Sequence, residues 1–324
     1  WEIDYFKQKL AGQELIFLAD KQLPPQDAEI LCNFVGSPAR ADLIGQLPKL
    51  KLIATRSTGF DHIDLKICAQ RGIMVSNVPT YGENTVAEFT FALILALSRK
   101  LYPAIKQVRE QGLFATDRLE GFDLQGKTLG IVGTGHIGEH VARMARGFNM
   151  NIVAFDPHPK AELTQQYGVE YAPLEGLLQK ADIVSLHVPY MPATHHLLNA
   201  SNIGLCKKGA IIINTARGGL VETAALVAAL KSGQIAGAGL DVLEEEGFVK
   251  DELEMLTAGH PNEDQLKTAL ADHDLMQMDN VLVTPHTAFN TREALLRILD
   301  TTAANIQNFI AGKPTNLVKL QFDS

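Results

Sequence analysis

The chain has 324 residues, which is longer than a single hydrophobic core usually supports, so two domains are expected. Hydrophobic residues make up 46% and charged residues 20% of the sequence, as in an ordinary globular protein rather than a disordered one. The formal net charge of −8 disfavours binding to nucleic acids and to anionic membranes, because both require a basic surface.

The first third of the chain alternates strand patterns with helical patterns. An amphipathic helix is expected at residues 1–10, and because an α/β domain usually begins with a strand, we expect the natural chain to carry a short strand before Trp1. Strands are predicted at residues 14–19, 28–34, 50–56 and 73–78, with helices at 39–46 and 63–70. Such alternation predicts a parallel sheet with helices on both faces.

A long helical pattern at residues 83–111, interrupted at Pro103, leads into a second series of strands. These six strands are predicted at residues 128–132, 151–155, 182–187, 210–214, 235–241 and 281–284. Six strands with helices between them predict a complete doubly wound sheet. The acidic stretch 244–279 is too long for an ordinary loop, so we expect a functional or partly helical insertion there, and a last helix covers 291–311.

The strongest motif is the glycine-rich sequence of residues 128–138, which joins a predicted strand to a predicted helix. Gly133 permits the tight turn, Gly135 lets the backbone approach a pyrophosphate, and Gly138 lets the helix pack closely on the strand. The helix start then binds the phosphate charge. Asp156 ends the next strand, where its carboxylate would accept hydrogen bonds from ribose hydroxyls and repel a 2′-phosphate, so NAD is favoured over NADP.

Residues 136–140 also match H-x-x-E-H, a zinc-protease pattern. We reject that interpretation, because it leaves Gly138 in mid-helix without a role, and we expect no metal site. His136 and Ile137 are instead included among the NAD-binding residues. His195 and His196 lack ligand-like spacing, so we expect them to be solvated surface residues.

Hydride transfer to a carbonyl requires a proton donor, a polarising group and an oriented substrate, and three predicted strand ends offer candidates. Arg217 follows one strand and is flanked by small residues that would let a ligand approach. It could bind a carboxylate with two hydrogen bonds, or it could be an ordinary loop arginine. Four acids within residues 241–246 follow the next strand, and the composition does not say which of them points inward. His286 follows the last strand, as a general acid or as a packing residue.

Together these motifs resemble the D-isomer-specific 2-hydroxyacid dehydrogenases. The resemblance covers nearly the whole chain, and its motifs lie at residues 56–64, 78–81, 129–138, 187–189, 214–219, 239–246 and 285–286. It implies two Rossmann-like or flavodoxin-like doubly wound parallel-sheet domains (fold class α/β) with a cleft between them. Residues 1–80 and 290–324 would form the substrate-binding domain, and residues 81–289 the NAD-binding Rossmann domain.

The resemblance also implies roles for individual residues. Arg217 would bind the substrate carboxylate and polarise the carbonyl, His286 would donate the proton in reduction, and Glu246 would pair with His286 and raise its pKa. Further substrate contacts would come from the backbone of Thr58 and Gly59 and from Tyr81. The residues placed around NAD are His187, Val188, Pro189, Thr215 and Asp241.

Within the family, the resemblance is greatest to the D-lactate dehydrogenase branch, because of Tyr81, the long insertion after Glu246 and residues 286–289. It implies that NADH reversibly reduces a small 2-keto acid, with pyruvate as the favoured substrate, to the D-2-hydroxy acid. It also implies a homodimer. The alternative is a NAD-sensing binding protein, like the transcriptional co-repressors of the same fold. Three widely spaced cysteines, no visible signal peptide and no membrane-length apolar run predict a cytoplasmic protein without a membrane partner.

Overall fold

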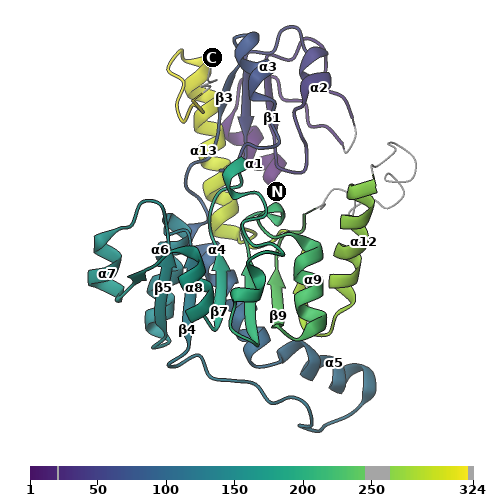
Figure 1. Cartoon of the computed structure of the whole chain (residues 1–324). Helices are drawn as coiled ribbons and strands as arrows, with labels where there is room; N and C mark the ends of the chain where they lie inside the picture. The colour runs from purple at the N-terminus through teal and green to yellow at the C-terminus, as the bar shows by residue number, and fades with distance from the viewer. Residues whose placement is uncertain (20–21, 245–262, 320–324) are drawn as a thin grey trace. The chain divides into compact units, whose positions relative to one another are not determined.

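The computed structural model describes residues 1–19, 22–244 and 263–319. The chain divides into two compact units, and each is described by itself (Figure 1). One unit combines Trp1–Gly82 with Asn290–Ser324, and the other is Glu83–Phe289. Within the described ranges, no helix has both the length and the apolar character needed to cross a membrane.

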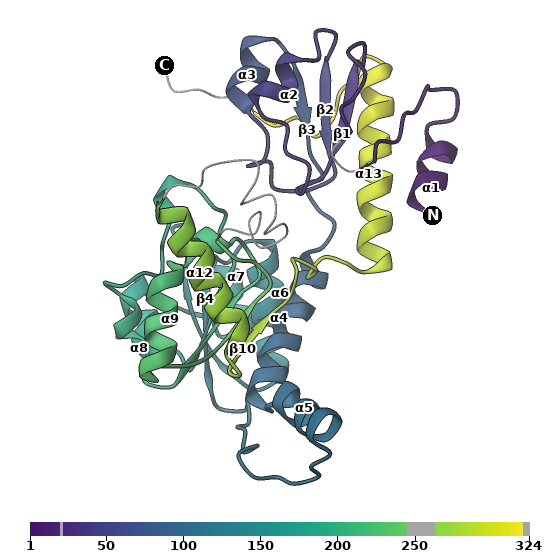
Figure 2. The same ribbon diagram turned by 90° about the vertical axis from the view of Figure 1, so that its right-hand side faces the viewer.

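The smaller unit is built on a three-stranded parallel sheet of order β1-β2-β3. Its strands are β1 (Ile30–Asn33), β2 (Leu52–Thr55) and β3 (Met74–Ser76), and its helices are α1 (Glu2–Lys9), α2 (Ala41–Gly45), α3 (Leu65–Gln70) and α13 (Arg292–Ile310). One face of the sheet packs on α2 and α3 around Ile44, Ile53 and Cys68, and the other packs on α1 and α13 (Figure 2).

The strand predicted at residues 14–19 is wrong, because these residues have no regular structure. Leu15 packs on the core beside α13, but Ile16, Phe17 and Leu18 are 55%, 40% and 36% exposed. An apolar run becomes a strand only where a neighbouring strand accepts its backbone hydrogen bonds, and in the described part of the sheet no strand pairs with this run.

The larger unit contains a seven-stranded parallel sheet of order β10-β9-β8-β7-β4-β5-β6. Its strands are β4 (Thr128–Val132), β5 (Asn151–Phe155), β6 (Glu170–Tyr171), β7 (Ile183–Leu186), β8 (Ala210–Asn214), β9 (Ile235–Leu240) and β10 (Val281–Val283). The six predicted strands are confirmed, whereas β6, with two residues, is too short to give a periodic pattern. The strand order reverses beside β4, which is the arrangement of a doubly wound sheet.

Helices cover both faces of this sheet (Figure 2). They are α4 (Glu83–Ser98), α6 (His136–Gly147), α7 (Ala161–Tyr167), α8 (Leu174–Lys180), α9 (Thr223–Ser232) and α12 (Glu263–Gln277), with short 3₁₀ turns η1 (Pro192–Thr194), η2 (Ile203–Leu205) and η3 (Gly218–Leu220). A further helix, α5 (Leu101–Gln111), follows α4 and buries no residue. On β8, Ile211 and Ile213 point to the core under α4 and α6, while Ile212 points to the core under α8 and α9. Burial on both faces explains the uninterrupted apolar runs of these strands.

The predicted long helix at residues 83–111 is two helices, and the break lies before Pro103. Lys100 has a left-handed backbone with φ of 49° and is the N-cap of α5, so the chain changes direction there after α4 ends at Ser98. Pro103 is the third residue of α5, in the first turn, where a missing backbone N–H breaks no hydrogen bond. The acidic stretch 244–279 is partly helical, since it contains α12, while its residues 245–262 lie outside the described ranges.

Candidate functional site

The glycine turn lies at the carboxyl end of β4, and its three glycines meet different constraints. Gly133 has φ of 95°, and a Cβ there would lie 2.8 Å from the His187 carbonyl oxygen. A Cβ on Gly138 would lie 2.0 Å from the Gly133 carbonyl oxygen. At Gly135, the N-cap of α6, φ is −63° and a Cβ would meet nothing within 4 Å. The protein's own packing requires the first two, whereas Gly135 leaves open the space in which a pyrophosphate is expected.

His136 and Ile137 are the first two residues of α6, where backbone N–H groups have no acceptor within the helix. The His136 side chain is exposed, and Ile137 packs partly on the core below α6. This geometry fits anion binding by the backbone at the helix start.

Asp156 binds the glycine turn directly. One carboxylate oxygen accepts hydrogen bonds from the backbone N–H (2.7 Å) and the hydroxyl (2.9 Å) of Thr134, and the other accepts from the backbone N–H of His158 (2.8 Å). Partial burial opposes ionisation, but hydrogen bonds from Thr134 and His158 outweigh it and hold the pKa of Asp156 below its ordinary value. The carboxylate therefore carries a charge beside the turn. Sequence reasoning missed Thr134, whose hydroxyl also accepts from Tyr171 at 3.2 Å.

Residues 187–189 form a wall beside the turn, directly after β7. The His187 backbone N–H donates to the Val132 carbonyl at 2.7 Å, and its Nε2 lies 2.8 Å from the Ser185 hydroxyl. Burial lowers the pKa of His187 to about 3, so the ring is neutral at physiological pH. Val188 is half-buried, with its Cγ1 2.8 Å from the position of a Gly133 Cβ, and Pro189 is exposed.

The turn after β8 carries Thr215 and Arg217. The Thr215 hydroxyl lies 3.0 Å from that of Thr90, and Thr90 donates its own proton to the Val86 carbonyl, so Thr215 is the donor between the two. Arg217 is half-buried, and its Nη1 donates to the Ala216 carbonyl at 2.8 Å.

The glycines after Arg217 have a different role from the predicted one. A Cβ on Gly218 would lie 1.9 Å from the Leu243 carbonyl oxygen, and one on Gly219 would lie 2.7 Å from the Tyr190 ring. These small residues are required because neighbouring protein segments pass there. The prediction that they let a ligand approach is therefore corrected.

Asp241 fixes the backbone around His286. Asp241 is 1% exposed, and its carboxylate accepts hydrogen bonds from the Thr284 hydroxyl (2.6 Å) and from the backbone N–H groups of Thr287 (2.9 Å) and Ala288 (2.8 Å). Its own carbonyl accepts from the His286 N–H at 2.8 Å. Burial raises the pKa of Asp241, and these hydrogen bonds offset part of that effect. They hold His286 in a left-handed conformation with φ of 52°, which is uncommon outside glycine.

Glu246 lies outside the described residues, but Glu244 of the same acidic run is described. One Glu244 oxygen contacts the His196 Nε2, and the other accepts from the Thr223 N–H (3.2 Å) and hydroxyl (2.9 Å). The prediction that His196 is a solvated surface residue is therefore wrong. No sequence signal indicated this pairing, because 48 positions separate the two residues. His195 is exposed, with its Nδ1 3.1 Å from the Tyr190 hydroxyl.

In the smaller unit, a tight turn after β2 carries Thr58 and Gly59. The Thr58 hydroxyl donates to the Val78 carbonyl at 2.8 Å, and the Ser57 hydroxyl donates to the Gly59 carbonyl at 2.6 Å. Among the described residues, no acceptor faces the backbone N–H of Thr58 or Gly59. Tyr81 is half-buried, and its carbonyl accepts from the Arg297 Nε at 2.6 Å.

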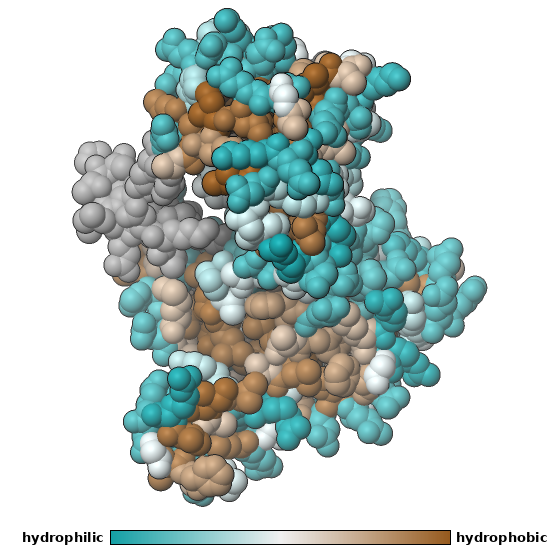
Figure 3. All heavy atoms as spheres, turned by 180° about the vertical axis from the view of Figure 1, so that it is seen from behind, coloured by the Kyte–Doolittle hydropathy of each residue, from teal (hydrophilic) through white to brown (hydrophobic). Residues whose placement is uncertain are grey.

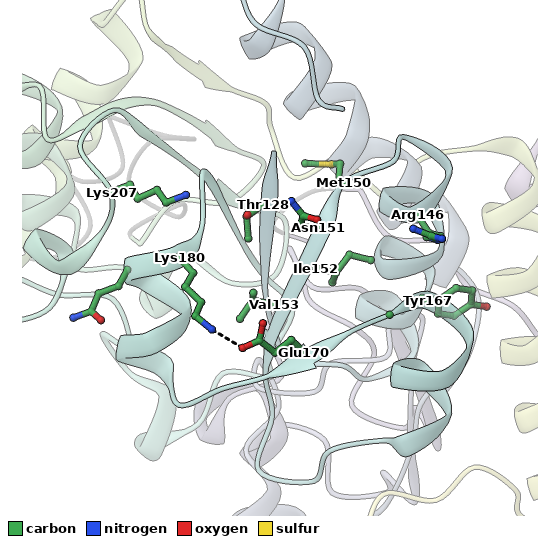
Figure 4. Close-up of a pocket in the computed structure, with 12 residues that line it drawn as sticks. Thr128, Arg146, Met150, Asn151, Ile152, Val153, Tyr167, Glu170, Lys180 and Lys207 are labelled. Carbon is green, nitrogen blue, oxygen red and sulfur yellow. Dashed lines mark hydrogen bonds and ion pairs between the residues drawn. The ribbon is translucent and has the colours of Figure 1, made fainter. Parts of the chain in front are cut away.

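A surface hollow of the larger unit lies at the end of the sheet where β4 and β5 begin, opposite the end that carries the glycine turn (Figure 4). Thr128 and Asn151, which begin β4 and β5, line it, together with Lys180 in an ion pair with Glu170. This hollow is therefore separate from the glycine turn. Within the described ranges, no group of three or more His, Cys, Asp or Glu residues could hold a metal ion.

The family model for the "D-isomer specific 2-hydroxyacid dehydrogenase, NAD binding domain" matches residues 91–288. The chain belongs to this family. It is 35% identical over 322 residues to a glyoxylate reductase of Korarchaeum cryptofilum, covering 98% of this chain and 90% of the relative. It is 39% identical over 292 residues to the D-lactate dehydrogenase kk1H of Curvularia clavata, covering 89% and 80%.

A solved structure agrees with these relatives. The D-lactate dehydrogenase of Aquifex aeolicus, complexed with NAD and lactic acid, has a TM-score of 0.85 and 35% identity, covering 96% of this chain and 93% of that one. The chain is thus a NAD-binding oxidoreductase of 2-hydroxy acids, and its glycine turn lies within the NAD-binding domain.

The glycine turn makes a first prediction. Gly135→Ala should leave the melting temperature within about 2 °C of the wild type, because its Cβ meets no protein atom. The same Cβ should raise the Kd for NADH about tenfold or more, because it would occupy the phosphate approach. Gly138→Ala should instead lower the melting temperature, because its Cβ overlaps the Gly133 carbonyl. NADH fluorescence titration and thermal unfolding measure both effects, and equal melting temperatures for the two variants would contradict this division.

Asp241 makes a second prediction. Asp241→Asn should lower kcat at least tenfold, because an amide offers one acceptor atom to a loop that presents three donors to the carboxylate. Thr284→Val, which removes only one donor, should have a smaller effect. If Asp241 acts by holding His286, the Kd for NADH should stay within about twofold of the wild type in both variants. A raised Kd with unchanged kcat would instead point to a direct contact with NAD.

Proposed function

We propose that this protein is a NAD-dependent D-2-hydroxyacid dehydrogenase that reversibly reduces a small 2-keto acid, with pyruvate as the first choice, to the D-2-hydroxy acid. One observation carries the proposal. At a single edge of the larger sheet, a glycine turn with open space at Gly135 lies in the same row of strand ends as Arg217 and His286. Names of relatives that include glyoxylate reductase and D-lactate dehydrogenase support a small acid.

NADH, when bound, supplies the hydride that forms the new C–H bond at the keto carbon. Arg217 binds the substrate carboxylate and polarises the carbonyl through its guanidinium. His286 gives a proton to the carbonyl oxygen, so the product is an alcohol and the histidine is left neutral. Glu246, which lies outside the described residues, would supply the carboxylate partner of His286.

Further residues bind the two ligands. The backbone N–H groups of Thr58 and Gly59, which have no acceptor among the described residues, hydrogen-bond the substrate carboxylate, and Tyr81 contacts the substrate. The residues that contact the cofactor are Gly133, Gly135, His136, Ile137, Gly138, Asp156, His187, Val188, Pro189 and Thr215. Asp241 lies beside them and acts by holding the loop that carries His286. The Asp156 carboxylate, with its lowered pKa, selects NAD by repelling a 2′-phosphate. The unit Glu83–Phe289 is the NAD-binding domain, and the other unit is the substrate-binding domain.

A third prediction tests this function. Oxidation of NADH and of NADPH is followed with 2-keto acids of increasing side-chain size, beginning with glyoxylate and pyruvate. We expect turnover with small acids and NADH, and product analysis should give the D-isomer. His286→Gln should lower kcat by about 10²–10⁴-fold while NADH binding persists, because only the proton donor is lost.

The controls separate the alternatives. Arg217→Lys keeps the charge but loses the planar pair of donors, so it should chiefly raise KM. Asp156→Ala should relax the preference for NADH over NADPH. NADH binding without turnover of any 2-keto acid would contradict the enzyme and favour a NAD-sensing protein. Unchanged turnover in His286→Gln would contradict the assigned proton donor.

We further infer that the protein is a cytoplasmic homodimer. The cytoplasmic location is supported by three free cysteines, of which Cys68 and Cys206 are buried, and burial raises the pKa of both thiols to about 11. The dimer is supported by α5, which buries no residue and exposes Leu101, Tyr102, Ile105 and Val108. Phe114, just beyond α5, is 96% exposed. Apolar side chains gather over this part of the unit at the lower left of Figure 3, and monomers rarely expose such clusters.

The fourth prediction concerns this surface. Sedimentation velocity should give a mass of twice the 35.3 kDa chain. The double variant Ile105→Asp, Val108→Asp should shift the protein toward the monomer, because two desolvated charges oppose burial of the face. Leu270→Asp on α12 is the control, since Leu270 is 68% exposed and lies elsewhere. A monomeric wild type would contradict the dimer.

A further inference from the structure

The turn that carries Arg217 lies between two other segments of the larger unit. On one side, the His196 backbone N–H donates to the Gly219 carbonyl at 2.8 Å, and the Leu198 N–H donates to the Leu220 carbonyl at 3.0 Å. On the other side, the backbone of Leu243 and Glu244 lies so close to Gly218 that a Cβ there would be 1.9 Å from the Leu243 carbonyl oxygen. The Arg217 turn is thus enclosed by the chain after β7 and the chain after β9.

The contact between His196 and Glu244 joins these two outer segments to each other. The Glu244 carboxylate is well buried, with its side chain 14% exposed, and that of His196 is 30% exposed. The other Glu244 oxygen accepts from the backbone N–H and the hydroxyl of Thr223, the first residue of α9. A negative charge at a helix start is favourable, so the carboxylate is held in place independently of His196.

We propose that His196 and Glu244 are positioning residues for Arg217. Their contact holds the chain after β7 and the chain after β9 together on the two sides of the Arg217 turn. The proposal rests on the proposed function of Arg217 as the group that binds the substrate carboxylate. The structure gives the connection: Glu244 anchors the chain after β9 to α9, its contact with His196 anchors that chain to the segment after β7, and both segments touch the turn. The bond needs a proton on the His196 Nε2, which the cation and one neutral tautomer both provide.

Two amide substitutions separate the hydrogen bond from the rest of the side chain. His196→Gln places an N–H donor near the position of Nε2, whereas His196→Asn is too short to reach Glu244. Asparagine is also common at positive φ, which suits the value of 49° at His196. His195→Asn is the matched control, because His195 stacks on His196 while its Nδ1 contacts the Tyr190 hydroxyl rather than Glu244.

Hydrogen exchange followed by mass spectrometry tests the closure without any substrate. In His196→Asn, peptides covering residues 217–224 should exchange about tenfold faster, because the Leu220 and Val221 N–H groups, which bond within the Arg217 turn, lose the support of the outer segments. His196→Gln and His195→Asn should exchange like the wild type. Unchanged exchange in His196→Asn, or equal acceleration in His195→Asn, would overturn the proposal.

Steady-state kinetics test the consequence for Arg217. His196→Asn should raise KM for the 2-keto acid about tenfold, with a smaller change in kcat and with the Kd for NADH within about twofold of the wild type. A purely structural loss of folded enzyme would lower kcat and leave KM unchanged, and His196→Gln should restore KM. An inactive wild type would refute the proposed function, while the exchange result would still decide whether His196 closes the turn. An active His196→Asn with wild-type KM would overturn the positioning role.

Discussion

The site of this protein depends on close backbone approaches that only glycine permits. At Gly138 the start of α6 lies against the Gly133 carbonyl, at Gly133 the turn lies against His187, and at Gly218 the Arg217 turn lies against Leu243. Each approach would place a Cβ within 2.8 Å of a backbone or side-chain atom, so any larger residue would force a shift. These contacts pack the loop after β4 against the loop after β7, and the loop after β8 against the loop after β9.

Carboxylates join the strand ends that the glycines bring together. Asp156 connects the end of β5 to the glycine turn, Asp241 connects the end of β9 to the loop after β10, and Glu244 connects the same chain to α9 and to His196. Each accepts backbone N–H groups, which satisfies its lone pairs where water is partly or wholly excluded. The opposing pKa directions of Asp156 and Asp241 follow from burial, since burial outweighs the hydrogen bonds only at Asp241.

This arrangement separates the tasks within the proposed reaction. The groups that would touch substrate, Arg217 and His286, have backbones held by neighbours, and these neighbours need not touch substrate themselves. Strain is present at His286, whose φ of 52° is maintained by the three hydrogen bonds of the Asp241 carboxylate. Such support allows a catalytic side chain to keep one orientation through turnover.

The sequence by itself determined the class of fold and the identity of the chemical groups. The runs of β4, β5 and β8 were predicted with the bounds observed, because strands that are buried on both faces show a continuous apolar pattern. The glycine turn, Asp156, Arg217 and His286 were predicted as site residues because each lies just after a predicted strand, which is a local property of the sequence. The run at 14–19 was wrongly predicted to be a strand. A strand forms only beside a neighbouring strand, and a local sequence pattern does not show whether that neighbour is present.

Only the tertiary structure decided how these groups are held. Glu244 contacts His196 across 48 positions, Asp241 binds Ala288 across 47, and Gly218 lies against Leu243, and none of these pairs shares a motif. The sequence supplied the residue types, but a carboxylate, an imidazole or a glycine has no partner until the strand order brings its loop beside another. That order is set by the packing of the whole sheet, so the partners of the site residues are long-range consequences of the fold.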